Sequence, residues 1–533
     1  MARDTSRSHR GIDRRSFLGG SLALGGGLAG LDLSRAQLVS AQAPKHGGTL
    51  VAAAEIDPIS LDPHTNSNFS ACQAFDHIYE SLTMYDEKTN IVPALAQSWE
   101  ITNNGKTYTF KLRPNVKFHN GQTMTAEDVK YSIDRVLDPK TASPWRSWFD
   151  QVEDIKAVDP LTVQFNLKAP YPLLGSFAGM RAAGIIPKGL AERENLKIKG
   201  IGTGPFKLVE YVPQDRIVYA RNPDYWDKPL PYLDGMVFKV LAEENPRLAA
   251  LRAGQIQYAF LLPQTAVQLE GVQGITVNRS PYAWVVLHYI NTRNKPLSDP
   301  RVRRAMRMAV DTGEVIQKAA FGAGVPSGPV PTGYGDWFLD PKTLPYLKAD
   351  VEGAKKLLAE AGYPNGGFKI EIKCSPQYPE FVATTLVIQE SLKKLNIDVT
   401  ATQMEWGAFV AENAKSNQSC GKEGSDIYAS ANTFRPDPDG FLYPYFHSKG
   451  PLNKGGCETP DAKLDGFLVE ARQATNHAER RRLYEEAQRI VVRDCPNWWW
   501  YAKFNIEAVS SKLQGYSQSF TGRRLFLKKA WLA

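Results

Sequence analysis

Cysteine and histidine are scarce in this chain of 533 residues, which holds 5 cysteines and 8 histidines. Five thiols are too few for a fold that depends on a dense disulfide framework. The histidines are scattered, no two of them stand at metal-ligand spacing, and no H-E-x-x-H motif occurs. We therefore expect no metal site and no cofactor.

Recognisable catalytic motifs are also missing. No G-x-S-x-G nucleophile elbow occurs after residue 43. Gly105-Lys106-Thr107 resembles the end of a phosphate-binding loop, but Glu100 stands where that loop needs its first glycine. Asp437–Gly440 resembles part of a calcium loop, yet it lacks the first ligand position and the later glutamate. The sequence therefore predicts no catalytic residues and a protein that is not an enzyme.

The chain lacks an apolar run long enough to span a membrane, which takes about 20 residues. The nearest candidate, Ser16–Leu31, has sixteen uncharged residues, six of them glycine. Arg14-Arg15 precedes it and the small-residue exit Ala41-Gln42-Ala43 follows. This pattern is typical of a secretory leader of the twin-arginine type. We expect residues 1–43 to be a signal peptide cleaved near Ala43, and the rest to be exported to the periplasm.

A strong charge of either sign is missing as well. The formal charge is +8, and residues 1–43 hold six arginines against three aspartates, so the remainder carries about +5. That charge is too small over such a length to indicate nucleic-acid binding. There is no internal repeat, and the length suits two or three domains.

The most informative stretch is a predicted strand–helix–strand unit followed by a third strand. The strands are expected at Phe368–Lys373, Ile397–Met404 and Asp426–Ser430, and the helix at Phe381–Leu395. Such a unit makes parallel strands, and ligands bind beyond the carboxyl ends of parallel strands. These ends, with the loop after a first strand at Gly48–Ala54, give candidate ligand-binding residues: Glu55, Gln377, Glu405, Trp406, Asn432, Phe434 and Arg435.

Other segments carry more ordinary predictions. Thr125–Asp128 indicates a capped helix that ends at Leu137, and the runs around Asn103–Lys106 indicate a hairpin. Ser298 is expected to cap a helix whose arginines face solvent: Arg301, Arg303, Arg304 and Arg307. In Trp498–Trp500, strand alternation aims the first and third indoles one way and the second the other. Core packing and, for Trp500, stacking on a ligand both remain open.

Several stretches resemble the family-5 extracytoplasmic solute-binding proteins, which serve ATP-driven importers. The most specific is 94–132, and Ser60–Pro63, Gly202–Phe206, Arg221–Trp226 and Asp299–Arg304 support it. The resemblance implies an α/β, two-lobed periplasmic-binding-protein fold (class II-like) with an inserted subdomain, hinged by two crossover segments. It places lobe I at 44–86, 196–286 and 501–533, the subdomain at 87–195 and lobe II at 287–500.

The resemblance also bears on single residues. Trp406 matches a tryptophan that lines the family's ligand cavity, and Asp437–Phe441 matches its D-P-D-x-F segment. Phe434 stands where the dipeptide binders hold the ligand's amine with an aspartate, and Glu380–Thr385 lacks the arginine that takes its carboxylate. Arg435 suits an anionic ligand group, or it bridges Asp437 or Asp439; both interpretations stay open.

The sequence thus predicts a monomeric periplasmic subunit that captures a peptide or peptide-like solute and passes it to an ABC permease, while a partner ATPase hydrolyses ATP. The alternatives are an anionic non-peptide solute, such as an opine or sugar acid, and a periplasmic hydrolase. Cys420 and Cys457 bracket the binding loop, and we hypothesise that they form a disulfide.

Overall fold

The computed structural model describes residues 43–66, 73–179, 183–418, 424–433, 435, 437–450 and 461–533, with only the backbone for 414–418. The chain from Pro44 to Ala533 forms one compact unit. No helix within the described ranges is both long and apolar enough to cross a membrane.

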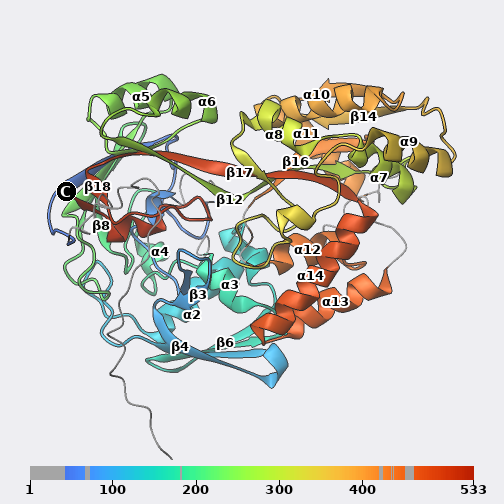
Figure 1. Cartoon of the computed structure of the whole chain (residues 1–533). Coiled ribbons are helices and arrows are strands. Elements are labelled where there is room, and N and C mark those ends of the chain that lie inside the picture. Colours follow the sequence, from blue (N-terminus) through green and yellow to red (C-terminus); the bar gives the residue numbers. More distant parts are fainter. Residues whose placement is uncertain are drawn as a thin grey trace, which may run out of the picture. The chain divides into compact units, whose positions relative to one another are not determined.

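Two long strands, β12 (Ile275–Ile290) and β17 (Asn497–Ser510), pair antiparallel in the middle of the largest sheet. Figure 1 shows them running side by side between two groups of elements. In the described part of the chain this sheet has eleven strands. On one side of the pair lie β11 (Tyr258–Phe260), β1 (Thr49–Ala54), β10 (Gly235–Val240), β9 (Arg216–Arg221) and β8 (Phe206–Val212). On the other side lie β16 (Ile427–Thr433), β14 (Lys369–Cys374) and β15 (Asp398–Gln403), and β13 (Gly324–Pro326) pairs with β17.

The β12–β17 ladder is interrupted twice near its middle, between Pro281 and Val285 and again between Val286 and Leu287. The register shifts between Pro281 and Val285, where Pro281 has no N–H group to donate. Both groups of strands are therefore joined through the same two strands.

The strand–helix–strand prediction is confirmed. β14 and β15 pair in parallel from Lys369↔Asp398 to Cys374↔Gln403, with α10 (Pro379–Lys393) between them in the chain. β16 is also parallel to β14. The carboxyl ends of all three strands consequently meet at one edge of the sheet, as predicted.

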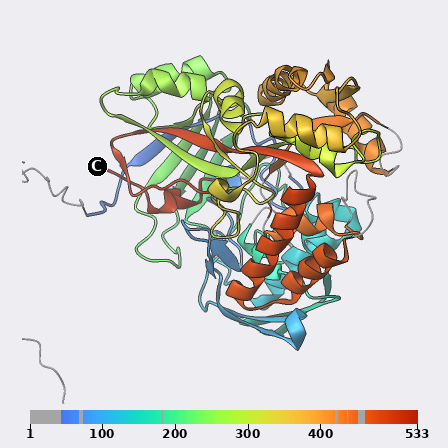
Figure 2. The ribbon, with the colours of Figure 1, turned by 45° about the vertical axis from the view of Figure 1, so that its right-hand side comes forward.

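A second sheet holds β4 (Ala96–Thr102), β5 (Thr107–Leu112), β7 (Thr162–Leu167) and β6 (Val152–Asp159), in that order. β4 and β5 form the predicted hairpin, and Thr125 with Asp128 forms the predicted capping box of α2 (Ala126–Leu137). In both views, α13 (Ala462–Gln473) and α14 (His477–Asp494) lie beside this sheet, and α14 leads into β17 (Figure 2). The exact domain boundaries stay a prediction.

The remaining elements complete the layers. The other helices are α3 (Leu173–Ala178), α4 (Leu190–Arg193), α5 (Glu244–Arg252), α6 (Pro263–Ala266), α7 (Pro300–Met308), α8 (Thr312–Ala320), α9 (Val351–Glu360), α11 (Trp406–Gln418) and α12 (Asp439–Phe446). The short strands are β2 (Thr83–Tyr85), β3 (Ile91–Pro93), β18 (Leu513–Gln514) and β19 (Trp531–Leu532).

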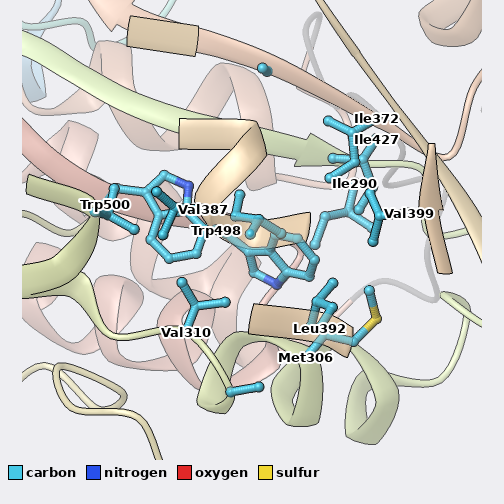
Figure 3. Close-up of a cluster of buried hydrophobic side chains, with 14 of the residues drawn as sticks. Ile290, Met306, Val310, Ile372, Val387, Leu392, Val399, Ile427, Trp498 and Trp500 are labelled. Carbon is cyan, nitrogen blue, oxygen red and sulfur yellow. The ribbon is translucent and has the colours of Figure 1, made fainter. Parts of the chain in front are cut away.

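The tryptophans at the start of β17 divide between two apolar cores, as strand alternation predicts. Trp498 and Trp500 pack with Met306, Ile372 and Leu392 (Figure 3). Trp499 packs into the cluster on the other face of the strand. Core packing is thus confirmed for all three indoles, which bury large apolar areas.

Two predictions about α7 are wrong. Its N-cap is Asp299, whose Oδ1 accepts from the Arg301 N–H at 2.8 Å, and not Ser298. Arg303 and Arg307 do not face solvent, since both are buried. The reason is that their guanidinium groups find acceptors inside. Arg303 donates to the carbonyls of Leu297, Asp494 and Cys495.

Arg307 ties α7 to β17. Its guanidinium donates to the Val310 and Tyr346 carbonyls at 3.1 Å and to Thr312 Oγ1 at 2.7 Å, and lies 4.2 Å from the ring of Trp500. Burial lowers the pKa of Arg307 to about 10, so the side chain stays charged at neutral pH. A helix that looks basic in sequence is therefore anchored by its cations.

We predict that Arg307→Met destabilises the protein by about 2–3 kcal/mol, because buried carbonyls lose their donor. Arg301→Met, at an exposed position of the same helix, should change the free energy of unfolding by about 1 kcal/mol or less. Urea unfolding of both variants measures the difference. Equal effects would contradict the anchoring role.

Candidate ligand-binding site

Three aromatic rings stand at the strand ends and form what we call the aromatic wall: Trp284, Tyr378 and Trp406. Trp406 is half-buried at the start of α11, and its ring centroid lies 4.9 Å from that of Tyr378. Tyr378 lies 5.9 Å from Trp284 of β12, and Phe409 stacks on Trp406 at 5.5 Å. The wall therefore joins the ends of β14 and β15 to the central strand pair.

An ion pair adjoins the aromatic wall. Lys503 of β17 donates to Glu380 Oε1 at 2.8 Å, and the ammonium lies 5.7 Å from the Trp284 ring. The side chains are only 24% and 12% exposed. Glu380 lies in the first turn of α10, the place where the family resemblance would put an arginine. Sequence reasoning missed Lys503, although it is the only lysine in the otherwise largely apolar β17.

Two of the predicted site residues are exposed at the same edge. Glu405 accepts from the Ala408 N–H at 3.1 Å, and the backbone N–H groups of Gly407 and Ala408 lower the pKa of its carboxyl. It therefore caps α11 next to Trp406. Gln377 follows the end of β14. Both side chains lie at the predicted edge, and their role in binding stays a prediction.

Asn432 and Arg435 lie at the end of β16. Asn432 is buried, and its Oδ1 accepts from the Tyr289 hydroxyl at 2.7 Å. The Arg435 guanidinium donates to the Thr433 carbonyl at 3.2 Å and to the Tyr445 hydroxyl at 3.1 Å. Phe434 lies outside the described residues.

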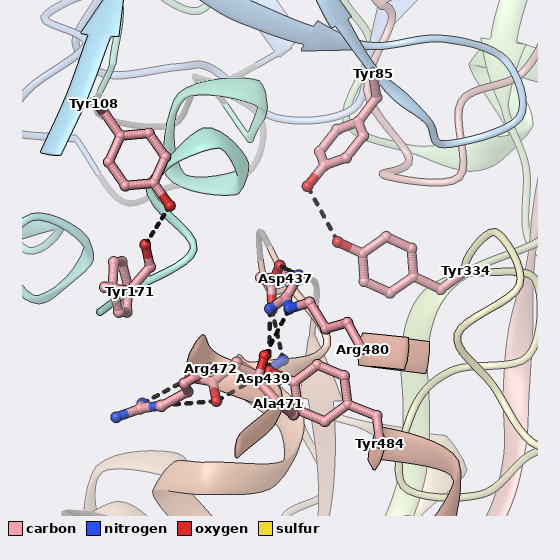
Figure 4. Close-up of polar contacts among 10 residues, drawn as sticks. All are labelled: Tyr85, Tyr108, Tyr171, Tyr334, Asp437, Asp439, Ala471, Arg472, Arg480 and Tyr484. Atoms are coloured by element: carbon pink, nitrogen blue, oxygen red, sulfur yellow. Dashed lines mark hydrogen bonds and ion pairs between the residues drawn. The ribbon is translucent and has the colours of Figure 1, made fainter. Parts of the chain in front are cut away.

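The neighbouring aspartates are held by other arginines (Figure 4). Asp437 accepts two hydrogen bonds from Arg480, at 2.6 and 2.9 Å, and Asp439 accepts two from Arg472, at 2.7 and 2.8 Å. Burial raises the pKa of Asp437, while Arg480 acts to lower it. These pairs fasten the D-P-D-x-F segment to α13 and α14, which indicates a structural role.

A cavity of about 300 Å³ lies elsewhere, between residues 85–175 and 334–480. Aromatic rings and the Asp437–Arg480 pair line it, but none of the predicted ligand-binding residues does. The polar groups around it are paired with one another: Tyr85 with Tyr334 at 3.1 Å, and the Tyr108 hydroxyl with the Tyr171 carbonyl at 2.8 Å (Figure 4). The cavity therefore offers a ligand mainly apolar contacts.

Glu55 is partly buried and Trp500 is fully buried, and each side chain is bonded to a neighbouring one. Glu55 Oε1 lies 2.9 Å from Arg524 Nη2. Trp500 is buried and donates its indole N–H to His288 Nδ1 at 2.9 Å, while His288 Nε2 lies 3.2 Å from Thr385 Oγ1. The contacts of both residues are thus with groups outside the aromatic wall. A ligand contact by Glu55 or Trp500 stays a prediction.

Within the described ranges, no three His, Cys, Asp or Glu side chains are grouped so that they could hold a metal ion. Cys374 and Cys495 are buried free thiols. Cys420 and Cys457, the hypothesised disulfide, lie outside the described residues.

Comparison with known proteins decides the family. Residues 90–453 match the sequence model of the bacterial extracellular solute-binding proteins, family 5. The chain belongs to this family. It is 30% identical over 467 residues to the glutathione-binding protein GsiB of Pectobacterium atrosepticum, covering 86% of this chain and 89% of that protein.

Two solved structures agree. The periplasmic binding protein DppA of Helicobacter pylori, in complex with the peptide STSA, is 29% identical with a TM-score of 0.71, covering 92% of this chain and 98% of that one. AgaA of A. tumefaciens R10, in complex with agropinic acid, is 27% identical with a TM-score of 0.72, covering 91% and 99%. The two-lobed α/β prediction is confirmed, and this family-5 protein is the solute-binding subunit of an ABC importer.

The burial of His288 predicts that the stability of the protein depends on pH. Burial lowers its pKa to about 3, whereas an unfolded histidine titrates near 6.5. Below pH 6.5 the unfolded chain therefore binds a proton that the folded protein does not, and stability falls as the pH falls.

We predict that the loss of unfolding free energy between pH 7.5 and 4.5 is roughly 2–3 kcal/mol smaller in His288→Gln than in the wild type. The exposed His477→Gln variant should show the wild-type loss. Urea titrations at the two pH values test this, and identical losses in all three proteins would rule it out.

Proposed function

We propose that this protein captures a peptide or peptide-like small solute at the aromatic wall and delivers it to a membrane permease. The observation that carries the proposal is the convergence of three parallel strand ends on Trp406, Asn432 and Arg435. A region with stacking surfaces and an ion pair suits reversible binding of a small amphipathic molecule.

Domain closure supplies the second wall of the site. β12 and β17 connect both groups of strands, and their ladder is irregular at Pro281–Val285. A ligand that contacts both lobes favours the closed form, and the permease would read that form. In this proposal the predicted residues need not line the cavity of about 300 Å³, because the site is completed only on closure.

In this proposal the protein itself catalyses no reaction, and the partner ATPase hydrolyses ATP. The relatives are binding proteins, and the strand ends carry no nucleophile–base pair in the contacts described above. A hydrolase would need such a pair within hydrogen-bond reach. We further propose that residues 1–43 are a twin-arginine leader and that the exported protein acts as a periplasmic monomer.

An anionic non-peptide solute is the second candidate. Arg435 stands at the end of β16, and the two carboxylates nearest in sequence are held by Arg472 and Arg480. Its planar guanidinium is suited to bidentate recognition of a carboxylate. AgaA, the relative solved with agropinic acid, provides a precedent within the family.

We predict that Trp406→Ala weakens solute binding by roughly 10-fold or more, because a ligand loses its stacking surface. Thermal stabilisation by a panel of di- to tetrapeptides measures the effect. Trp148→Ala, also half-buried but in another part of the chain, is the matched control. Turnover of the peptides, in place of stoichiometric stabilisation, would instead support a hydrolase.

Arg435→Ala separates the two solute classes. If the solute is anionic, the variant should lose at least about 10-fold more affinity for an opine or sugar acid than for a neutral peptide. Calorimetric titration with one probe of each class tests this. Similar losses for both would leave only the peptide-type solute.

A further inference from the structure

The Lys503–Glu380 pair has an unusual setting for a structural ion pair. It links β17 to the first turn of α10 at 2.8 Å, at the edge where the strands end. Both side chains are mostly removed from water, and the Trp284 ring lies 5.7 Å from the ammonium. The charges therefore stand at the aromatic wall and not on a solvated surface.

Two buried polar groups near the strand ends lack a hydrogen-bond partner among the described residues. Trp284 Nε1 is buried without a hydrogen-bond partner among the described residues, and so is the hydroxyl of Ser375, which follows β14. A buried donor without a partner costs free energy, so such groups commonly mark a place that a ligand or water fills. One wall thus presents a cation, an anion and an unused donor.

The spacing of the two charges restricts what they can both bind. An ammonium and a carboxylate that touch each other complement a ligand whose own opposite charges are equally close. In an α-amino-acid head group, the ammonium and the carboxylate are attached to the same carbon atom. An extended tripeptide, by contrast, separates its terminal charges by roughly 7–10 Å. Only the first arrangement can meet both partners at once.

We propose that Lys503 and Glu380 recognise the free α-amino-acid head group of the solute, with the ligand carboxylate on Lys503 and the ligand ammonium on Glu380. The Trp284 N–H would donate to the same carboxylate. The ligand brings equal and opposite charges, so no net charge is buried when the site closes. This inference rests on the proposed capture of a solute at the aromatic wall.

The test compares two isomers by isothermal titration calorimetry of the purified protein. S-methylated γ-Glu-Cys-Gly has a free α-amino-acid head group, whereas S-methylated α-Glu-Cys-Gly has the same atoms and charges without that group. We expect the γ-linked isomer to bind roughly 30-fold tighter or more. N-acetylation of the γ-linked isomer should abolish the advantage.

Variants test whether the preference for the γ-linked isomer depends on the Lys503–Glu380 pair. Lys503→Met and Glu380→Gln should each remove the preference for the γ-linked isomer. Lys373→Met breaks a similarly buried pair, Lys373–Glu412 at 3.0 Å, and should keep it. The exchange Lys503→Glu with Glu380→Lys retains an ion pair, so it should keep the melting temperature of the unliganded protein but lose the preference.

Three results would overturn the inference: equal binding of the two isomers, no binding of the γ-linked isomer, or wild-type preference in the exchanged variant. The last would show that the pair only holds α10 to β17. Tight binding of the α-linked isomer alone would overturn this inference but would still support the proposed function. Failure of the inference can therefore be distinguished from failure of the proposed function.

Discussion

The antiparallel pairing of β12 with β17 is the interaction on which the rest of the structure depends. These two strands connect the strand groups on either side, and every other strand of the large sheet is placed by reference to them. They also carry the side chains that matter most at the strand ends, Trp284 and Lys503. The same two strands therefore connect the two strand groups and carry part of the candidate binding surface.

Buried cations provide the second constraint. Arg303 and Arg307 fasten α7 to the start of β17, and Arg472 and Arg480 fasten the D-P-D-x-F segment to α13 and α14. Each guanidinium satisfies several acceptors in fixed directions, which apolar packing cannot do. These elements are thereby tied to one another by directional hydrogen bonds as well as by apolar packing.

Much of the fold followed from local pattern. Alternation and helical periodicity located β14, α10, β15 and β16 within a few residues, because each has one buried face that the sequence repeats. The α7 predictions failed for the opposite reason. Charge predicts exposure only on average, and two of the acceptors that make burial of Arg303 favourable come from residues almost 200 positions away.

At the candidate site, too, sequence reasoning found only the residues that a local rule can locate. Trp406, Asn432 and Arg435 could be selected because parallel strands bring their ends to one edge by a rule that needs no long-range detail. Lys503 and Trp284 could not, since they reach that edge from β17 and β12, which pair with each other across more than 200 residues of sequence.

By itself, then, the sequence determined the family, the strand–helix–strand unit and the edge at which the strand ends meet, because these depend on short-range periodicity and on a long matching stretch. The tertiary structure alone decided which charges meet at that edge. Lys503 and Glu380 are 123 residues apart, and only the packing of β17 against α10 brings them within 2.8 Å.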